Sequence, residues 1–326
     1  MGPRPTSRLL STSPGVEPVH ARGGLEPGVV AALLLQATIS AGTFLVAKRA
    51  LVEVPVTTLM LWRFLLTAVV FGLLLLMLPG PALPPRRAVL AAVLLGLLAG
   101  PLNQGLFFAG LQRSTAAHAA LLYALTPIGV YLYSVLRGLE APSARAGVGL
   151  LLAFAGALVL LLAHGTRALS GVFVGDVLIL GAVIAWVLYT AEGKAFIGEH
   201  GAVRATAWSM IAGALWLAPL APWELRPQFI LGADLVVKGS ILYLALLASV
   251  ASYLLWYWAL GRTDASKVAV FSNLQPVATA VAAWLVLGEP IGWEVAVGGV
   301  LVLAGVRLTA AARPPASGVP GPVREG

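Results

Sequence analysis

Long apolar segments alternate with short polar or Pro- and Gly-rich breaks along almost the whole chain. Each segment has about 20 residues, the length that an α-helix needs to cross the hydrocarbon core of a bilayer. The pattern predicts ten membrane-spanning helices, at residues 29–49, 55–78, 86–110, 115–137, 145–164, 171–193, 203–222, 236–260, 265–287 and 291–311. Residues 1–28 and 312–326 are rich in Pro, Gly and Ser, and we expect two disordered tails there. The predicted fold class is therefore an all-α integral membrane protein.

A repeat runs through this pattern, because residues 111–127 align with residues 260–276 without a gap. Within these segments the alignment matches Arg113 with Arg262, Ser114 with Thr263, Ala116 with Ala265 and Pro127 with Pro276. The same offset continues beyond them and matches Glu140 with Glu289, Gly149 with Gly298 and Gly156 with Gly305. The chain thus reads as one unit written twice, at residues 29–164 and 171–311. Five helices per copy is an odd number, so the second copy enters the membrane upside down. Inverted five-helix repeats of this kind are typical of transporters.

Composition supports a lipid environment. Hydrophobic residues make up 59% of the chain and charged residues 10%, against about 25% charged in soluble domains. The absence of cysteine excludes disulfides and thiolate chemistry. The net charge of +8 fits Lys and Arg in cytoplasmic loops better than nucleic-acid binding. The side that holds the N-terminal tail has more than twice as many Lys and Arg as the other side. We therefore expect a multi-pass protein of the plasma membrane with both termini cytoplasmic.

Three motifs carry a resemblance to a known family: WRF at residues 62–64, GDVLILGAVIAWVLY at 175–189 and LGEP at 287–290. In this order they resemble the EamA family of the drug/metabolite transporter superfamily, over about residues 29–310. The resemblance implies a transporter of small metabolites, often an exporter of amino acids or related compounds, with a central cavity. The chain departs from the family pattern at one position. Trp186 is the family tryptophan of the second repeat, but the matching position of the first repeat is Ser40.

Polar groups inside a bilayer cost free energy unless they find partners, so they mark candidate binding sites. The predicted cavity residues are Ser40, Thr43, Asn103, Gln104, Tyr123, Thr126, Trp186, Tyr189, Ser249, Ser252, Tyr253, Trp256, Ser272 and Asn273. Within the segment 236–260, Ser249, Ser252, Tyr253 and Trp256 stand at i, i+3, i+4 and i+7 and share one helix face. Aromatic faces with a few polar groups suit an amphipathic organic solute. The alternative is that these residues serve helix packing.

Prolines and charges suggest structural roles. Pro127 and Pro276 each free a backbone carbonyl inside a predicted span, and we expect two related helix breaks that face one cavity, with simple kinks as the alternative. Arg63 is expected to be a structural anchor in the outer part of its helix, where it can reach toward the interface or helix-end carbonyls, with substrate contact as the alternative. Glu140 and Glu289 should hold loop–helix junctions through charged partners or backbone N–H groups. His118 is expected at the interface, with proton carriage left open.

None of the acidic residues is placed at the middle of a predicted helix, which favours a facilitator or exchanger over a proton- or sodium-coupled carrier, or a coupling site outside the centre. The sequence contains no catalytic, metal-binding or cofactor-binding motif, and we expect no enzyme activity, metal or cofactor. The expected function is secondary transport of a small organic metabolite, in the outward direction. The partners are that solute and the lipid bilayer, with a homodimer left open. The alternatives are a non-transporting scaffold or receptor, or a transporter of drugs or nucleotide-linked sugars.

Overall fold

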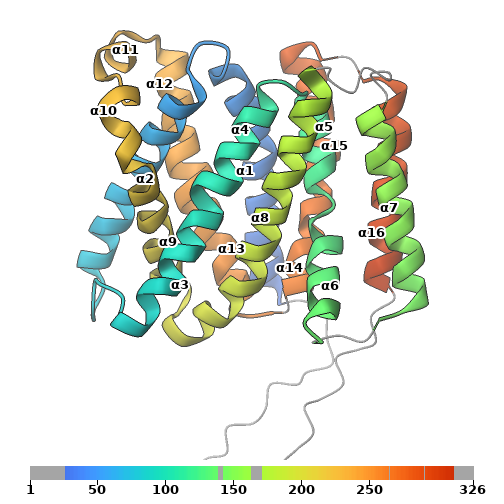
Figure 1. Cartoon of the computed structure of the whole chain (residues 1–326), viewed down its shortest axis with the longest axis horizontal. Helices are drawn as coiled ribbons and strands as arrows, with labels where there is room; N and C mark the ends of the chain where they lie inside the picture. The colour runs from blue at the N-terminus through green and yellow to red at the C-terminus, as the bar shows by residue number, and fades with distance from the viewer. Residues whose placement is uncertain (1–25, 139–141, 163–170, 264, 290, 312–326) are drawn as a thin grey trace, which may run out of the picture.

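The structure is a computed structural model that describes residues 26–138, 142–162, 171–263, 265–289 and 291–311. These residues form helices joined by short connections (Figure 1). The helices are α1 (Pro27–Ala50), α2 (Val56–Met77), α3 (Arg86–Leu97), η1 (Leu98–Gly105), α4 (Leu106–Leu111), α5 (Ala116–Tyr123), α6 (Thr126–Leu136), α7 (Ala144–Leu162), α8 (Gly171–His200), α9 (Ala202–Leu217), η2 (Ala218–Leu220), α10 (Ala221–Glu224), α11 (Pro227–Gly232), α12 (Leu235–Leu242), η3 (Tyr243–Ala251), α13 (Ser252–Leu260), α14 (Ala265–Val270), η4 (Phe271–Leu274), α15 (Gln275–Leu287) and α16 (Trp293–Ala311).

Seven helical stretches in the described part of the chain are long and apolar enough to cross a membrane. They are Pro27–Ala50, Val56–Met77, Arg86–Leu111, Ala116–Leu136, Gly171–His200, Ala202–Glu224 and Leu235–Leu260. Three apolar helices are shorter: Ala144–Gly156, Ala278–Leu287 and Trp293–Gly305. The expectation of an all-helical membrane protein is thus confirmed. The tail predicted at residues 1–28 is two residues too long, because Pro27 opens α1, where a proline without an N–H group is favoured.

Two kinds of irregularity interrupt the long stretches. The helix of α5 ends at Tyr123, and α6 restarts at Thr126 with Pro127 in its first turn. In the second half, α15 begins at Gln275 with Pro276 in its first turn. Proline is tolerated there because the first turn needs no N–H donor. In addition, η1 and η3 are π-helical, a wider winding that is frequent at functional sites.

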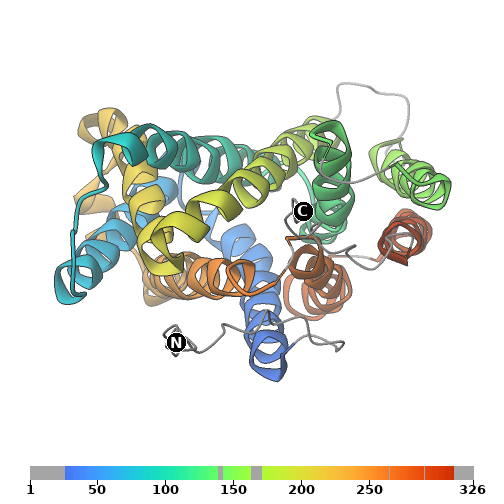
Figure 2. The same ribbon diagram turned by 90° about the horizontal axis from the view of Figure 1, so that it is seen from below.

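Helices α7 and α16 lie side by side at one edge of the molecule (Figures 1 and 2). Their backbones touch, since a Cβ on Gly156 would lie 2.7 Å from the Gly298 carbonyl oxygen. A Cβ on Gly305 would likewise lie 2.5 Å from the Gly149 carbonyl oxygen. Only glycine permits this approach. The contact is reciprocal, because the sequence repeat matches Gly156 with Gly305 and Gly149 with Gly298.

Candidate functional site

A cavity lies among the helices, lined by residues from several of them. Its lining residues are Gln36, Ser40, Thr43, Phe44, Arg63, Asn103, Gln104, Phe107, Tyr123, Trp186, Ala248, Ser252, Tyr253, Trp256, Ser272 and Gln275. They come from both halves of the chain, on α1, α2, η1, α4, α5, α8, η3, α13, η4 and α15. The walls thus combine aromatic rings with amide and hydroxyl groups.

A chain of hydrogen bonds begins at Arg63 and runs along one wall. The guanidinium donates through Nε to Ser249 Oγ (2.7 Å) and through Nη1 to Gln104 Oε1. Gln104 Nε2 donates to Asn103 Oδ1 and, at 3.2 Å, to the Tyr253 hydroxyl. Asn103 Nδ2 then donates to the Tyr123 hydroxyl and to the Ala182 carbonyl, both at 2.8 Å. All of the amide groups in this chain are therefore satisfied, as burial in an apolar environment requires.

A second polar group occupies the wall formed by α1 and α13. Gln36 Nε2 donates to Ser40 Oγ (2.8 Å) and to Ser252 Oγ (3.2 Å). Gln36 is buried, yet its Oε1 has no hydrogen-bond partner among the described residues. The same holds for the indole nitrogen of Trp256. Among the described residues, the Gln36 amide oxygen and the Trp256 indole N–H of the cavity wall thus have no hydrogen-bond partner.

Aromatic rings form the rest of the wall in two groups. Trp186 packs against Tyr253 and Trp256, with ring centroids 5.3 and 5.4 Å apart. Phe44 meets Phe107 and Tyr123 edge-to-face, with centroids 5.4 and 5.8 Å apart. Edge-to-face and tilted pairs fix the rings in place, so the apolar part of the site is preformed.

Most predicted cavity residues come together in the structure. Those that line the cavity are Ser40, Thr43, Asn103, Gln104, Tyr123, Trp186, Ser252, Tyr253, Trp256 and Ser272. Three others stand behind the wall. Thr126 bonds back to the Tyr123 carbonyl, Tyr189 pairs with Ser209, and Ser249 holds the Arg63 guanidinium. The side chain of Asn273, and the whole of Glu140, lie outside the described residues.

Two expectations need correction. Arg63 does not reach toward the interface: it is 1% exposed and lines the cavity, because Ser249 and Gln104 supply acceptors there. His118 is not interfacial but 1% exposed, because Asp176 lies 2.9 Å from its Nδ1. Neither error could be avoided from the sequence alone, since in both cases the partners lie on other helices.

Sequence reasoning left Gln36, Phe44, Phe107 and Gln275 out of the predicted cavity. The spacing of Gln36 and Phe44 relative to Ser40 is i−4 and i+4, so one helix face carries all three. That periodicity could have identified both residues. Gln275 is a polar residue next to Pro276 inside a predicted span, and that signal could have identified it as well. Phe107 gives no comparable signal in so apolar a chain.

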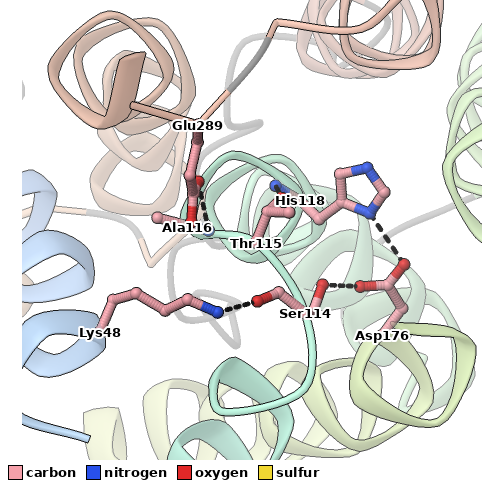
Figure 3. A network of polar contacts seen from close by, with 7 residues as sticks. All are labelled: Lys48, Ser114, Thr115, Ala116, His118, Asp176 and Glu289. Carbon is pink, nitrogen blue, oxygen red and sulfur yellow. Dashed lines mark hydrogen bonds and ion pairs between the residues drawn. The ribbon is translucent and has the colours of Figure 1, made fainter. Parts of the chain in front are cut away.

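Five residues form a polar cluster at the end of the molecule where α5 begins (Figure 3), and we call this the upper cluster: Lys48, Ser114, His118, Asp176 and Glu289. Lys48 Nζ donates to the carbonyl oxygens of Leu111 (2.9 Å) and Ser114. Ser114 Oγ and His118 Nδ1 both contact the carboxylate of Asp176, which is fully buried. Glu289 Oε2 accepts from the backbone N–H of Ala116 at 3.0 Å. The Glu289 carboxylate thus lies at the loop–helix junction where α5 begins.

A matching contact lies toward the opposite end, and we call it the lower contact. Lys194, near the end of α8, donates through Nζ to the Thr263 carbonyl at 2.7 Å. The repeat in the sequence matches Lys194 with Lys48 and Thr263 with Ser114. In each half, therefore, a lysine binds the carbonyl just before a short helix that leads to a proline break.

These features define a class of protein. The exposed large hydrophobic side chains lie all along the helices, and the polar groups face an internal cavity. Among the described residues, no group of three His, Asp or Glu side chains could hold a metal ion. Apolar spans around a polar cavity are the construction of a membrane transporter.

Comparison with known proteins gives the family. The chain belongs to the EamA-like transporter family, which it matches over residues 27–162 and again over 173–311. It is a multi-pass membrane protein. An uncharacterized transporter of Archaeoglobus fulgidus is 31% identical over 86% of this chain and 96% of its own length. A probable amino-acid metabolite efflux pump of Salmonella typhimurium is 30% identical over 49% of this chain and 56% of its own length. A solved crystal structure shares the fold, with a TM-score of 0.62 at 19% identity over 87% of this chain and 96% of that one.

Proposed function

We propose that this protein is a secondary transporter that exports a small organic metabolite, such as an amino acid or a derivative, across the plasma membrane. The observation that carries the proposal is the cavity, whose lining comes from both halves of the chain. A site built at the interface of two repeats is where secondary transporters bind their solutes. The efflux function in the name of the Salmonella relative supports the outward direction.

The proposed topology is ten spanning helices in two inverted five-helix repeats, residues 29–164 and 171–311, with both termini cytoplasmic. The two separate segments that match the family support this division. The reciprocal glycine contact between α7 and α16 also supports it, because an approximate two-fold axis would exchange Gly156 with Gly305. The bias of lysine and arginine supports an orientation in which the end that carries the upper cluster faces the outside of the cell.

The proposed mechanism is alternating access, in which the two ends of the cavity open in turn. The upper cluster holds α1, α5 and α8 together at one end, while the lower contact holds α8 against the segment before α14 at the other. Breaking one set while the other stays intact would expose the cavity on one side only. The proline breaks at Pro127 and Pro276 separate these contacts from the rest of each helix and would serve as the bending points.

The proposed energetics are those of a facilitator or exchanger. The cavity lining that the structure describes contains no carboxylate, and Asp176 is held by Ser114 and His118 away from that lining. A coupled carrier needs an ion site whose occupancy depends on the solute. Counterflow in proteoliposomes that persists with an ionophore would support this proposal, and strict dependence on a proton gradient would contradict it.

The test of transport itself begins with metabolites in cells that contain or lack the protein. We expect one group of solutes to accumulate in the medium only when the protein is present, and purified protein should exchange the same solutes in vesicles. The variant Ser252→Leu fills the cavity and should abolish the exchange, while Leu76→Met on the exposed face of α2 should not. A scaffold or receptor would show no exchange and no effect of Ser252→Leu.

A further inference from the structure

The guanidinium of Arg63 is a buried positive charge without a negative partner in the described structure. Arg63 is 1% exposed and lines the cavity. Its hydrogen-bond partners are neutral: Ser249 Oγ and Gln104 Oε1. No described residue forms a salt bridge with Arg63, and the lining described above contains no Asp or Glu. An isolated charge in an apolar environment is costly unless an opposite charge compensates it.

The orientation of the neutral hydrogen-bond partners is fixed, and each of them turns an acceptor toward the guanidinium or toward the next group in the chain. Arginine can only donate hydrogen bonds and a backbone carbonyl can only accept them. With Arg63 at one end and the Ala182 carbonyl at the other, the amides of Gln104 and Asn103 must both point the same way. The serine hydroxyl of Ser249 donates to the Leu244 carbonyl, so its lone pair faces Arg63. The protein therefore fixes the guanidinium in place without neutralising it.

Because the amides of Gln104 and Asn103 donate to two phenol oxygens, the hydroxyl groups of Tyr253 and Tyr123 are left to act as donors. Tyr253 accepts from Gln104 and Tyr123 accepts from Asn103. Each phenol then has its own O–H to donate, and the described residues supply no acceptor for either. Both side chains line the cavity. The indole N–H of Trp256, which also lacks a described partner, adds a further donor to the lining.

We infer that Arg63 is the carboxylate-binding residue of the cavity and that the solute is a small monocarboxylate with an apolar or aromatic body. A carboxylate would accept the forked N–H groups of the guanidinium. The phenols of Tyr123 and Tyr253 are the further donors on the lining, while Trp186, Phe44 and Phe107 would contact the apolar body. The inference rests on the proposed function and deepens it, because it makes the carboxylate, and not the amine of an amino acid, the required group.

The test uses three probes with one common body: 3-phenylpropionate, its primary amide and 3-phenylpropylamine. Calorimetric titration of the purified full chain should give at least about tenfold tighter binding of the carboxylate than of either analogue, because hydrogen bonds to a charged group are the strong ones. Arg63→Gln should remove this preference. Arg63→Lys should keep it in weaker form, since it keeps the charge but loses the fork. The matched control Arg87→Gln changes an exposed arginine of α3 and should bind as the unchanged protein does.

Three outcomes would overturn the inference: no binding of the carboxylate, equal binding of the amine or amide, or a carboxylate preference that survives in Arg63→Gln. If Arg63→Gln fails to fold, the comparison of probes on the unchanged chain and on Arg63→Lys still decides. Failure of the proposed function has a different signature. In that case the carboxylate binds and depends on Arg63, but vesicles that contain the protein do not exchange it.

Discussion

The two ends of the molecule are held by related contacts but with different strength. At each end a lysine donates to the backbone carbonyl before a short helix: Lys48 to Ser114, and Lys194 to Thr263. At the upper end this bond is only part of a cluster that includes a fully buried carboxylate, Asp176. At the lower end Lys194 is exposed. The positions that match Asp176 and His118 in the repeat are Val30 and Lys267, so the sequence does not repeat this contact there.

This difference indicates that the two ends of the cavity need not open equally easily, although the two halves of the chain are similar. Buried charges interact more strongly than exposed ones, because solvent does not screen them. Among the described contacts, opening the upper end separates Asp176 from His118, whereas opening the lower end releases the exposed Lys194 from the Thr263 carbonyl. We therefore expect the upper end to be closed in the resting protein. Each substitution below tests one contribution to that imbalance, and they follow in order of decreasing effect.

The largest effect is expected for Asp176→Leu. The substitution removes two hydrogen bonds to a buried carboxylate, those with Ser114 Oγ and His118 Nδ1, and at about 1.5–3 kcal/mol per bond it costs about 3–6 kcal/mol. The free energy of unfolding in detergent should fall by that amount. Glu199→Leu changes an exposed carboxylate of the same helix and serves as the control. If Asp176→Leu unfolds like the control, the upper cluster does not stabilise the fold.

The two lysines allow a direct comparison. Lys48→Met should weaken the upper end by about 1.5–3 kcal/mol, the usual contribution of a hydrogen bond from a charged group. Lys194→Met should weaken the lower end by less than about 1 kcal/mol, because the group is exposed. Since the chain has no cysteine, Ser252→Cys provides a single label in the cavity.

Modification of that cysteine by a membrane-impermeant thiol reagent reports which end is open. Lys48→Met should speed modification from the upper side several-fold, and Lys194→Met should speed it from the lower side by a smaller factor. Ser252→Cys in the otherwise unchanged chain is the reference. Equal effects of the two lysine variants would contradict the imbalance, and so would a larger effect of Lys194→Met.

A smaller effect is expected for Glu289→Gln. The carboxylate accepts from the first N–H of α5, where a negative charge is favourable, and the loss should be about 1 kcal/mol. The repeat matches Glu289 with Glu140 and Ala116 with Ala265. Glu140→Gln should therefore cost a similar amount at the lower end, as measured by thermal unfolding. If only one of the two variants has a lower unfolding temperature, Glu289 and Glu140 do not play equivalent roles in the two copies of the repeat.

The smallest effect is expected for Glu53→Gln. Its carboxylate pairs with Arg49 at 2.6 Å, but both side chains are about 40% exposed. Exposed pairs of this spacing contribute at most about 0.5 kcal/mol. The unfolding temperature should hardly change, although the pair lies near the upper cluster. A large fall in the unfolding temperature would mean that the exposure of a contact does not determine how much it stabilises the protein.

The helical membrane fold could be predicted because span length and apolar composition are local properties of the sequence. Ser40, Asn103, Gln104 and Ser252 were found for a related reason: a polar residue in an apolar span must have a partner. The role of Arg63 could not be predicted, because its position near a helix end allowed an interfacial reading, and only the approach of η1 and η3 supplies its acceptors. The Asp176–His118 pair was missed because helices distant in the sequence create it.

The wall from Arg63 to Ala182 has one more consequence, for the movement of protons. Guanidinium, amide and carbonyl groups exchange protons far less readily than carboxylates or imidazoles. A chain of such groups with one fixed direction offers no proton wire. Such a wall would not itself carry protons across the membrane when a solute passes.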